Sequence, residues 1–256
     1  MTHRWLPVVV LAAAACRSAG PVVPAPNPAT RPAPVAATSA PAGTATSFRA
    51  PKEIRWVRDS AEHRALFLQV YRQATAHVEQ EALVRPTGTW AVVLDADETV
   101  LDNSMYQVER AMVDKPFDRD SWRAWTARRE AVPLPGAAAF LTRVTMLGGV
   151  VAIVTNRTET ECPDTEAVFL AHGLPFDLML CKPDDAVSEK NARFEGIARG
   201  TTPAGLPPLD IVAFIGDNVL DFPGLSQEAG KQGDEAFAEF GVRFFMLPNP
   251  MYGSWN

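Results

Sequence analysis

Three short apolar runs, each ending abruptly in polar residues, constrain the fold of this chain more than any other feature of its sequence. The runs are 90–94, 150–154 and 211–215. Each is as long and as continuously apolar as a strand that is buried on both faces, which is the usual situation in parallel sheets. Residues 178–180 and 243–247 are weaker strand candidates.

Segments with apolar residues at helical spacing lie between these runs. They are 54–83, expected as one long helix or two shorter ones, 136–147, 162–172 and 188–199. Strands that alternate with helices predict an α/β fold, namely a parallel, Rossmann-like sheet with helices on both faces. Ligands in such folds bind beyond the carboxyl ends of the strands. The functional site is therefore expected where the apolar runs end.

Acidic residues follow two of the three runs. Asp95 and Asp97 come directly after the first run, and Asp217 and Asp221 follow the third. Carboxylates this close together at a buried strand end are costly unless a positive charge compensates them, and hard oxygen ligands favour Mg²⁺. A helix N-cap with an adjacent acid is the alternative explanation of the first pair.

The second run is followed by Thr155, Asn156 and Arg157. Their hydroxyl, amide and guanidinium groups can donate hydrogen bonds to phosphate oxygens, although an ST-turn that opens a helix would have the same sequence. The carboxyl ends of parallel strands meet at one edge of the sheet. Polar residues after all three runs therefore predict one shared site.

Charge and hydropathy argue against two function classes. Residues 1–51 hold four of the 24 basic residues and none of the 30 acidic ones, so the remainder carries a net charge of −10. A body this acidic is a poor match for a nucleic-acid polymer, whose phosphates are neutralised by Lys and Arg. No apolar run approaches the ~18 residues of a membrane-spanning helix.

The N-terminal 51 residues are expected to serve export. Residues 1–15 have the basic start and short apolar stretch of a signal peptide. The small residues before Cys16 are similar to a bacterial lipobox, in which the cysteine is lipidated; an ordinary cleaved signal peptide is the alternative. Residues 16–51 are rich in Pro and Ala and predict a disordered tether. We expect a lipid-anchored protein of the cell envelope, in the outer membrane and facing the periplasm or the surface, with a soluble periplasmic or secreted protein as the alternative.

Two further cysteines, Cys162 and Cys181, remain if Cys16 is lipidated. They can pair in an oxidising compartment, but two buried free thiols fit the sequence equally well, because the sequence does not determine their separation. Neither has a second Cys or His at zinc-ligand spacing.

The acidic motifs resemble the four-part pattern of the haloacid dehalogenase (HAD) superfamily of phosphatases. Residues 93–103 (VLDADETVLDN) and 215–222 (IGDNVLDF) are similar to the paired signatures of bacterial class C acid phosphatases, which include lipid-anchored 5′-nucleotidases. The resemblance implies a HAD-type phosphatase domain over 52–256, with an N-terminal helical extension and with 103–135 inserted as a small helical cap.

The resemblance also implies a role for each acidic residue. Asp95 would be the nucleophile that forms an aspartyl-phosphate. Asp97 would protonate the leaving oxygen and then activate water, and because it must be protonated for the first step, an acidic pH optimum is expected. Mg²⁺ would be held by the Asp95 carboxylate, the Asp97 main-chain carbonyl and Asp217, with Asp221 behind these ligands.

Phosphate binding is expected from Thr155 and Asn156, which would donate hydrogen bonds, and from Lys190 in Ser-x-Lys, which would offset the negative charge. Lys182, just after a candidate strand, is the rival to Lys190. Arg157 and Arg193 are open to two interpretations, phosphate contact or a structural ion pair.

Trp122 and Tyr252 match family positions whose rings stack on a nucleoside base, a contact that tolerates several nucleotides. Packing inside the cap is the alternative for Trp122. The expected function is a Mg²⁺-dependent acid phosphatase that hydrolyses phosphomonoesters, foremost nucleoside 5′-monophosphates. A broad-specificity phosphatase or phosphotransferase and a surface-tethered nucleotide-binding protein with little activity are the alternatives. The oligomeric state stays open, with a homodimer as one option.

Overall fold

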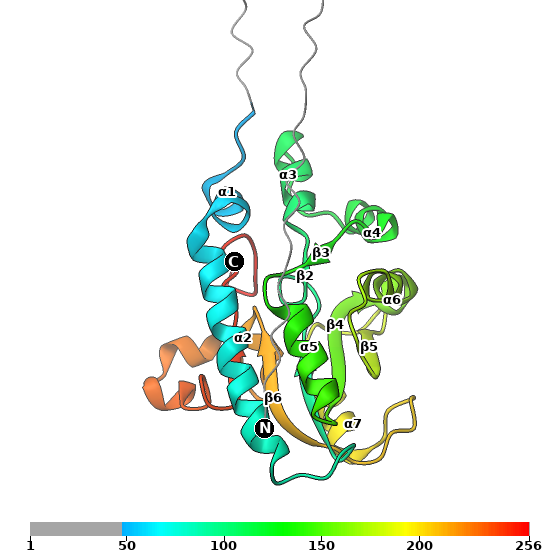
Figure 1. Ribbon diagram of the computed structural model, residues 1–256. Coiled ribbons are helices and arrows are strands. Elements are labelled where there is room, and N and C mark those ends of the chain that lie inside the picture. Colours follow the sequence, from blue (N-terminus) through cyan, green and yellow to red (C-terminus); the bar gives the residue numbers. More distant parts are fainter. Residues whose placement is uncertain (1–47, 256) are drawn as a thin grey trace, which may run out of the picture. The chain divides into compact units, whose positions relative to one another are not determined.

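A parallel five-stranded sheet forms the centre of the folded chain. The computed structural model describes residues 48–255, so the predicted signal peptide, Cys16 and most of the tether lie outside the described residues. The strand order is β5-β4-β1-β6-β7, and every neighbouring pair is parallel (Figure 1). The strands are β1 (Trp90–Leu94), β4 (Val150–Thr158), β5 (Leu178–Lys182), β6 (Asp210–Gly216) and β7 (Phe244–Met246). The predicted α/β fold is confirmed, and each strand candidate forms a strand.

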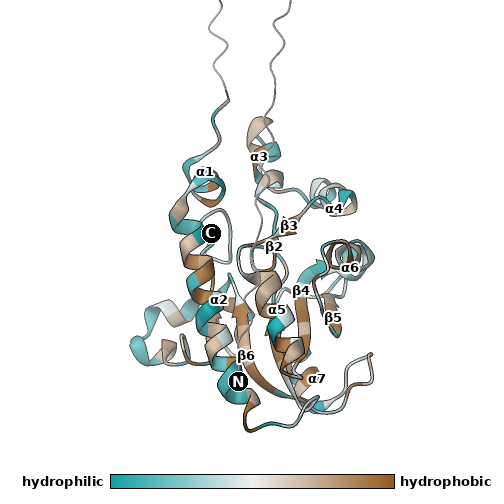
Figure 2. Ribbon diagram, viewed as in Figure 1, coloured by the Kyte–Doolittle hydropathy of each residue, from teal (hydrophilic) through white to brown (hydrophobic). Residues whose placement is uncertain are grey.

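Helices cover both faces of this sheet. One face packs against α2 (Ala61–Ala82), α5 (Ala137–Met146) and α6 (Cys162–Ala171), and the other against α7 (Asn191–Arg199). Alternate residues of β1 belong to the two cores, Val92 and Leu94 to the first and Ala91 and Val93 to the second. Since successive side chains of a strand point to opposite faces, a strand covered on both sides is apolar along nearly its whole length, as Figure 2 shows for β6.

The predicted N-terminal helical extension consists of two helices. The first, α1 (Lys52–Asp59), ends at Ser60, whose backbone is extended and whose hydroxyl accepts a hydrogen bond from the His63 N–H at 3.1 Å. Such an N-cap satisfies one of the backbone donors at the start of α2. Further along α2, the Tyr71 hydroxyl donates to the Thr99 carbonyl at 2.8 Å. This bond fixes the long helix to the loop that follows β1.

The predicted helical cap contains α3 (Ser104–Met112) and α4 (Arg119–Arg128), which lie beyond the carboxyl ends of the strands (Figure 1). Two short strands at its base, β2 (Leu101–Asp102) and β3 (Val132–Pro133), pair antiparallel. We did not predict this pair, because two residues are too few to show the alternation that identifies a strand. The pair brings the two ends of the cap segment together on the sheet domain.

Two element boundaries differ from those expected at the sheet edge. β4 continues to Thr158, so Thr155, Asn156 and Arg157 lie within the strand and not in a turn after it. The extension follows from pairing with β5, where Thr158 aligns with Lys182 after a shift in register. The expected helix over 188–199 begins at Asn191, which leaves Lys190 at its N-cap.

Cys162 and Cys181 form a disulfide, with their Cα atoms 6.0 Å apart. The bond joins the first residue of α6 to β5. The sequence left this pairing open, and the packing of α6 beside β5 decides it.

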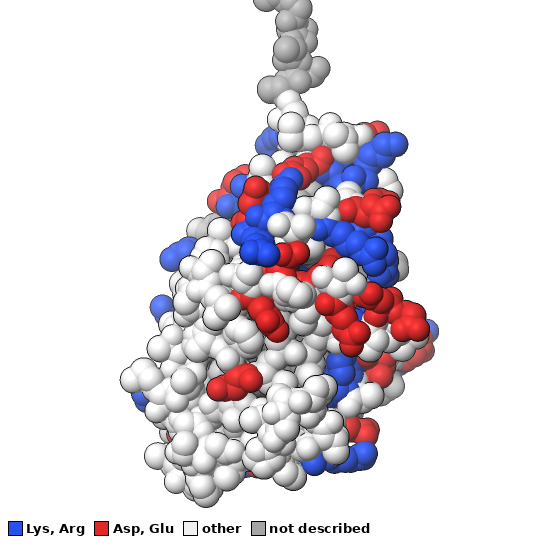
Figure 3. Space-filling view, turned by 90° about the vertical axis from the view of Figure 1, so that its right-hand side faces the viewer, with Lys and Arg blue, Asp and Glu red and all other residues white. Residues whose placement is uncertain are grey.

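Two surface properties bear on function. Within residues 48–255, no helix combines the length and the apolar character needed to cross a bilayer. On the face of the molecule shown in Figure 3, basic side chains are interspersed with acidic ones and form no continuous basic surface.

Candidate active site

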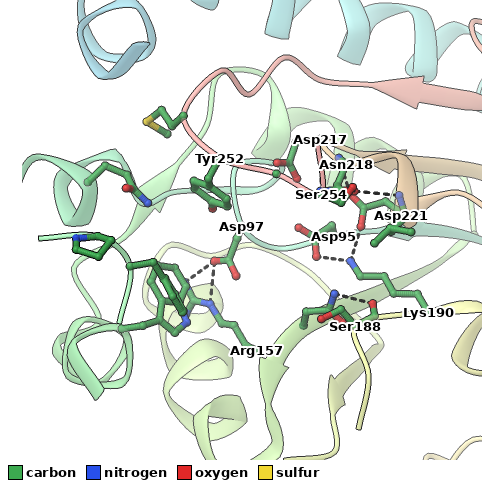
Figure 4. A pocket seen from close by; sticks show the side chains of 18 residues that line it. Asp95, Asp97, Arg157, Ser188, Lys190, Asp217, Asn218, Asp221, Tyr252 and Ser254 are labelled. Atoms are coloured by element: carbon green, nitrogen blue, oxygen red, sulfur yellow. Dashed lines mark hydrogen bonds and ion pairs between the residues drawn. The ribbon is translucent and has the colours of Figure 1, made fainter. Parts of the chain in front are cut away.

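A pocket of about 640 Å³ opens at the carboxyl ends of β1, β4 and β6, bounded by the cap and by the C-terminal residues (Figure 4). Eight of the nine predicted site residues line it: Asp95, Asp97, Trp122, Asn156, Lys190, Asp217, Asp221 and Tyr252. The ninth, Thr155, is fully buried in β4 beside Asn156 and does not line the pocket. The structure therefore brings polar residues that follow all three apolar runs to one pocket.

Lys190 is the central cation of the pocket. Its ammonium group lies 2.5 Å from Asp95 Oδ1 and 2.7 Å from Asp221 Oδ1, and its side chain is 2% exposed. Figure 4 shows it reaching up between these two carboxylates. The rival Lys182 is buried elsewhere and donates to the main-chain carbonyl of Ala186 at 2.8 Å. Lys190 and not Lys182 is thus the lysine that faces the acidic residues.

The acidic residues are held in an environment that opposes their ionisation. Burial, followed by repulsion from Asp221 and Asp97, raises the pKa of Asp95 to about 7, although Lys190 counteracts this. Burial and the same kind of repulsion raise the pKa of Asp217 well above its ordinary value. Burial alone would lower the pKa of Lys190, but Asp221 and Asp95 outweigh it and raise that pKa. One lysine therefore does not fully offset the negative charge.

The donor set fits a divalent cation. Carboxylate oxygens of Asp95, Asp217 and Asp221 lie within 4.8 Å of one another, and hard oxygen ligands at this density suit Mg²⁺. Both oxygens of Asp217 accept hydrogen bonds, which hold its carboxylate in place. Asn249 Nδ2 donates to Oδ2 at 2.8 Å, and the Thr99 hydroxyl donates to Oδ1 at 3.4 Å. A bound cation would supply the charge compensation that the pKa shifts show to be missing.

Both oxygens of Asp221 also have partners. Oδ1 faces Lys190 and Oδ2 accepts a hydrogen bond from the Asn218 N–H at 2.9 Å. The main chain comes very close here, and any Cβ at Gly216 would collide with the Asp221 side chain. The glycine thus permits the close approach, and Asp221 is placed to orient Lys190.

Asp97 is separated from this group and faces the cap. Its Oδ1 accepts hydrogen bonds from Asn103 Nδ2 at 2.8 Å and from Arg157 Nε at 2.9 Å, and Arg157 Nη2 lies 2.8 Å away. For Arg157 the structure therefore favours the ion pair over phosphate contact. Arg193, the other arginine with two possible roles, donates to the Thr155 carbonyl at 2.5 Å and to Asn156 Oδ1 at 2.7 Å.

The Asn156 side chain contacts the segment before α7 and α7 itself. Besides accepting from Arg193, its amide Nδ2 donates to the Ser188 carbonyl at 2.8 Å. The Thr155 hydroxyl accepts from the Arg157 main-chain N–H at 3.1 Å. The two Asn156 contacts join the end of β4 to the segment that carries Lys190.

The cap and the C-terminal residues give the pocket an aromatic side. Trp122 packs edge-on against Tyr106, with ring centroids 5.0 Å apart, and also contacts Phe117. Phe117 is 62% exposed and lines the pocket together with Trp122 and Tyr252. Trp122 therefore packs within the cap and faces the pocket at the same time, so the two interpretations of this residue are compatible.

Sequence reasoning missed three residues that orient side chains of the pocket. Asn103 contacts Asp97, Asn249 contacts Asp217, and Ser254 donates to Asn218 Oδ1 at 2.7 Å. Asn103 lies inside the recognised segment 93–103, and Asn249 lies three residues before the predicted Tyr252. This closeness to recognised residues was the available signal, but a single amide side chain does not reveal its partner before the chain is folded.

The fold and this site define a phosphatase of the HAD type. The family model for the HAD superfamily, subfamily IIIB (acid phosphatase), matches residues 36–255. The chain belongs to this family, and the class C acid phosphatase resemblance is confirmed. It is accordingly a phosphomonoesterase.

Two solved structures are similar over most of the chain. The class C acid phosphatase from Bacillus anthracis is 30% identical and matches with a TM-score of 0.70, covering 79% of this chain and 84% of that one. A structure of the class C acid phosphatase from the same organism with tungstate bound is 28% identical, has a TM-score of 0.71 and covers the same shares of the two chains.

Proposed function

We propose that this acid phosphatase hydrolyses nucleoside 5′-monophosphates, with Mg²⁺ and through an aspartyl-phosphate on Asp95. The observation that carries the proposal is the arrangement of one pocket. Asp95 is buried beside Lys190 at one end, and the aromatic residues Trp122 and Tyr252 line the same space. The first end suits a phosphate dianion and the second a flat nucleobase.

The residues of the pocket suit a two-step transfer. In the first step an Asp95 oxygen attacks phosphorus, the bond from phosphorus to the ester oxygen breaks, and Asp97 gives that oxygen its proton. In the second step Asp97 takes a proton from water, which attacks phosphorus and releases Asp95 and inorganic phosphate. Lys190, beside Asp95, stabilises negative charge on the transferring group.

Mg²⁺ would be held by the carboxylates of Asp95 and Asp217 and by the main-chain carbonyl of Asp97. When bound, it would supply positive charge to the phosphoryl oxygens and keep the buried carboxylates ionised. The tungstate bound by the Bacillus anthracis enzyme supports an oxyanion site, since tungstate and phosphate share a tetrahedral shape.

The proposal is tested by phosphate release from AMP and from ribose 5-phosphate between pH 4 and 8, with Mg²⁺ or with EDTA. We expect metal-dependent release that is strongest at acid pH, faster with AMP, and at least about 10³-fold lower in Asp95→Asn. No release from AMP under any condition would contradict it. Equal rates with both substrates would favour a broad-specificity phosphatase, and a new phosphate ester formed with an added alcohol would indicate a phosphotransferase.

We also propose that the protein is exported and lipid-anchored through Cys16. The disulfide between Cys162 and Cys181 supports an oxidising compartment. Labelling of the expressed protein with a radioactive fatty acid, compared between the wild type and Cys16→Ala, tests the anchor. If neither the wild type nor Cys16→Ala is labelled, the anchor proposal is wrong and the alternative of a soluble periplasmic or secreted protein is favoured.

A further inference from the structure

Arg157 is a fully buried arginine beside the active site. Its side chain is 1% exposed, although arginine is rarely buried without a partner for its charge. It extends from β4, one residue after Asn156, toward the cap and not toward Lys190 (Figure 4). Each of its three nitrogens donates to another protein group. A phosphate-binding role would require guanidinium donors directed at the substrate, whereas each guanidinium nitrogen here is directed at a protein acceptor.

The donors around Asp97 converge on one oxygen. Asp97 Oδ1 accepts hydrogen bonds from Asn103 Nδ2 at 2.8 Å and from Arg157 Nε at 2.9 Å, and Arg157 Nη2 lies 2.8 Å from the same oxygen. No group within residues 48–255 donates a hydrogen bond to Oδ2, and in Figure 4 both dashed lines from Arg157 meet the same oxygen. Hydrogen bonds to charged groups are stronger than neutral ones. The carboxyl group is therefore held by Oδ1, and Oδ2 is left for the substrate.

The same contacts join Asp97 to the cap. Asn103 Oδ1 accepts hydrogen bonds from Arg157 Nη2 at 3.0 Å and from Trp125 Nε1 at 2.9 Å. The Arg157 guanidinium also lies 5.6 Å from the centre of the Trp122 ring. On its other side, Arg157 Nη1 donates to the Thr165 hydroxyl of α6 at 3.2 Å. The guanidinium is thus fixed between the sheet domain and the cap.

We propose that Arg157 and Asn103 are positioning residues for the acid–base function of Asp97. They hold the carboxyl group by Oδ1 so that Oδ2 meets the leaving oxygen of the ester, and Trp125 ties this arrangement to the cap. The inference rests on the proposed role of Asp97. A general acid must lie within hydrogen-bond reach of the atom it protonates, and a carboxyl group free to rotate would meet that condition only part of the time.

The test uses two leaving groups. The nucleoside released from AMP needs a proton as it departs, whereas p-nitrophenolate departs as a stable anion and gains little from an acid. In Arg157→Met we expect kcat/KM for AMP to fall about 100-fold and that for p-nitrophenyl phosphate to fall less than about 5-fold. Trp125→Phe, which keeps a ring but removes the donor to Asn103, should show the same selectivity with a loss of about 5-fold for AMP.

Arg128→Met is the matched control. Arg128 also lies over a cap tryptophan, 4.6 Å from the Trp125 ring centre, and also pairs with a carboxylate, Glu109, but it makes no contact with Asp97. We expect both substrates to be hydrolysed at nearly the wild-type rate. Circular dichroism spectra and melting temperatures establish that each variant is folded. If Arg157→Met does not fold, the comparison of the two substrates is made with Trp125→Phe instead.

Asp97→Asn separates failure of this inference from failure of the proposed function. If Asp97→Asn loses AMP activity selectively but Arg157→Met lowers both substrates equally, Arg157 has only a structural role and the inference is wrong, while the function stands. If Asp97→Asn itself lowers both substrates equally, Asp97 is not the acid and the inference fails with that role. Selective loss of AMP activity in both variants supports the inference.

Discussion

The two ends of the pocket are built in different ways. At the sheet end, Asp95, Lys190 and Asp221 are buried and come from strand ends or the segments directly after them. At the other end, Trp122 and Tyr252 are only partly buried and come from a cap helix and from the C-terminal residues. The first end is charged and densely hydrogen-bonded, and the second is mainly aromatic.

Under the proposed function, this difference would separate the residues that carry out the chemistry from those that select the substrate. Charged groups must be held rigidly and away from water to act strongly on a transferring phosphoryl group, and strand ends covered by helices on both faces provide that rigidity. An aromatic surface needs only to present a flat apolar area, which cap residues can do while remaining partly exposed. We therefore expect substitutions at the sheet end to affect kcat for every substrate, and substitutions at the aromatic end to affect KM for nucleotides.

The largest effect is expected from Lys190→Met. Removing this ammonium leaves Asp95 and Asp221 facing each other unpaired, so kcat should fall at least about 100-fold for all phosphomonoesters. The free energy of unfolding should also fall, by about 3 kcal/mol, because a buried charge loses its partner. Steady-state kinetics and denaturant unfolding measure the two effects.

Two variants sharpen this prediction. Adding Asp221→Asn to Lys190→Met should restore part of the stability but none of the activity. Lys182→Met removes a lysine that is also buried but bonds only main-chain carbonyls, and it should keep wild-type kcat. Full activity in Lys190→Met would show that the sheet end does not depend on this cation.

A smaller, substrate-specific effect is expected at the aromatic end. Tyr252→Ala should raise KM for AMP about 10-fold, since stacking of a base on an aromatic ring contributes about 1–3 kcal/mol, and should leave ribose 5-phosphate unchanged. Tyr252→Phe keeps the ring and should behave like the wild type. An equal rise in KM for AMP and ribose 5-phosphate would remove the distinction between the two ends.

The smallest effect is a pH-dependent stabilisation by Mg²⁺. The folded pKa of Asp95 is raised to about 7 and that of Asp217 is also raised, so the metal-free protein loses stability as pH rises from the ordinary aspartate range, about 4, through about 7. At the proposed site, Mg²⁺ would bind the ionised carboxylates and compete with protons. Its addition should raise the melting temperature by about 5 °C at pH 7.5 and by less at pH 5.

Thermal melts with Mg²⁺ and with EDTA at both pH values measure this difference. Asp217→Asn, which removes one proposed metal ligand, should lose the Mg²⁺ effect at both. An Mg²⁺ effect that is equal at pH 5 and pH 7.5 would show that the cation binds elsewhere than at these carboxylates.

The sequence by itself determined the architecture and the place of the candidate site. Apolar runs and helical periodicity are local signals, because burial on both faces of a sheet requires continuously apolar strands. They located all five strands, and the polar residues after them located the pocket. Asp95, Asp97, Asp217 and Asp221 were identified because the two acidic segments are long and specific, and the Ser-x-Lys context of Lys190, read through the family resemblance, favoured it over Lys182.

Only the tertiary structure decided which groups touch. The sequence left two roles open for Arg157, phosphate contact or an ion pair. Its partner Asp97 lies 60 residues earlier in the chain. The disulfide, the contact of Asn249 with Asp217 and the link from Trp125 through Asn103 to Asp97 are of the same kind. Periodicity and motifs describe neighbours along the chain, whereas these contacts join separate elements. Their geometry exists only once the sheet, the cap and the C-terminal residues have packed together.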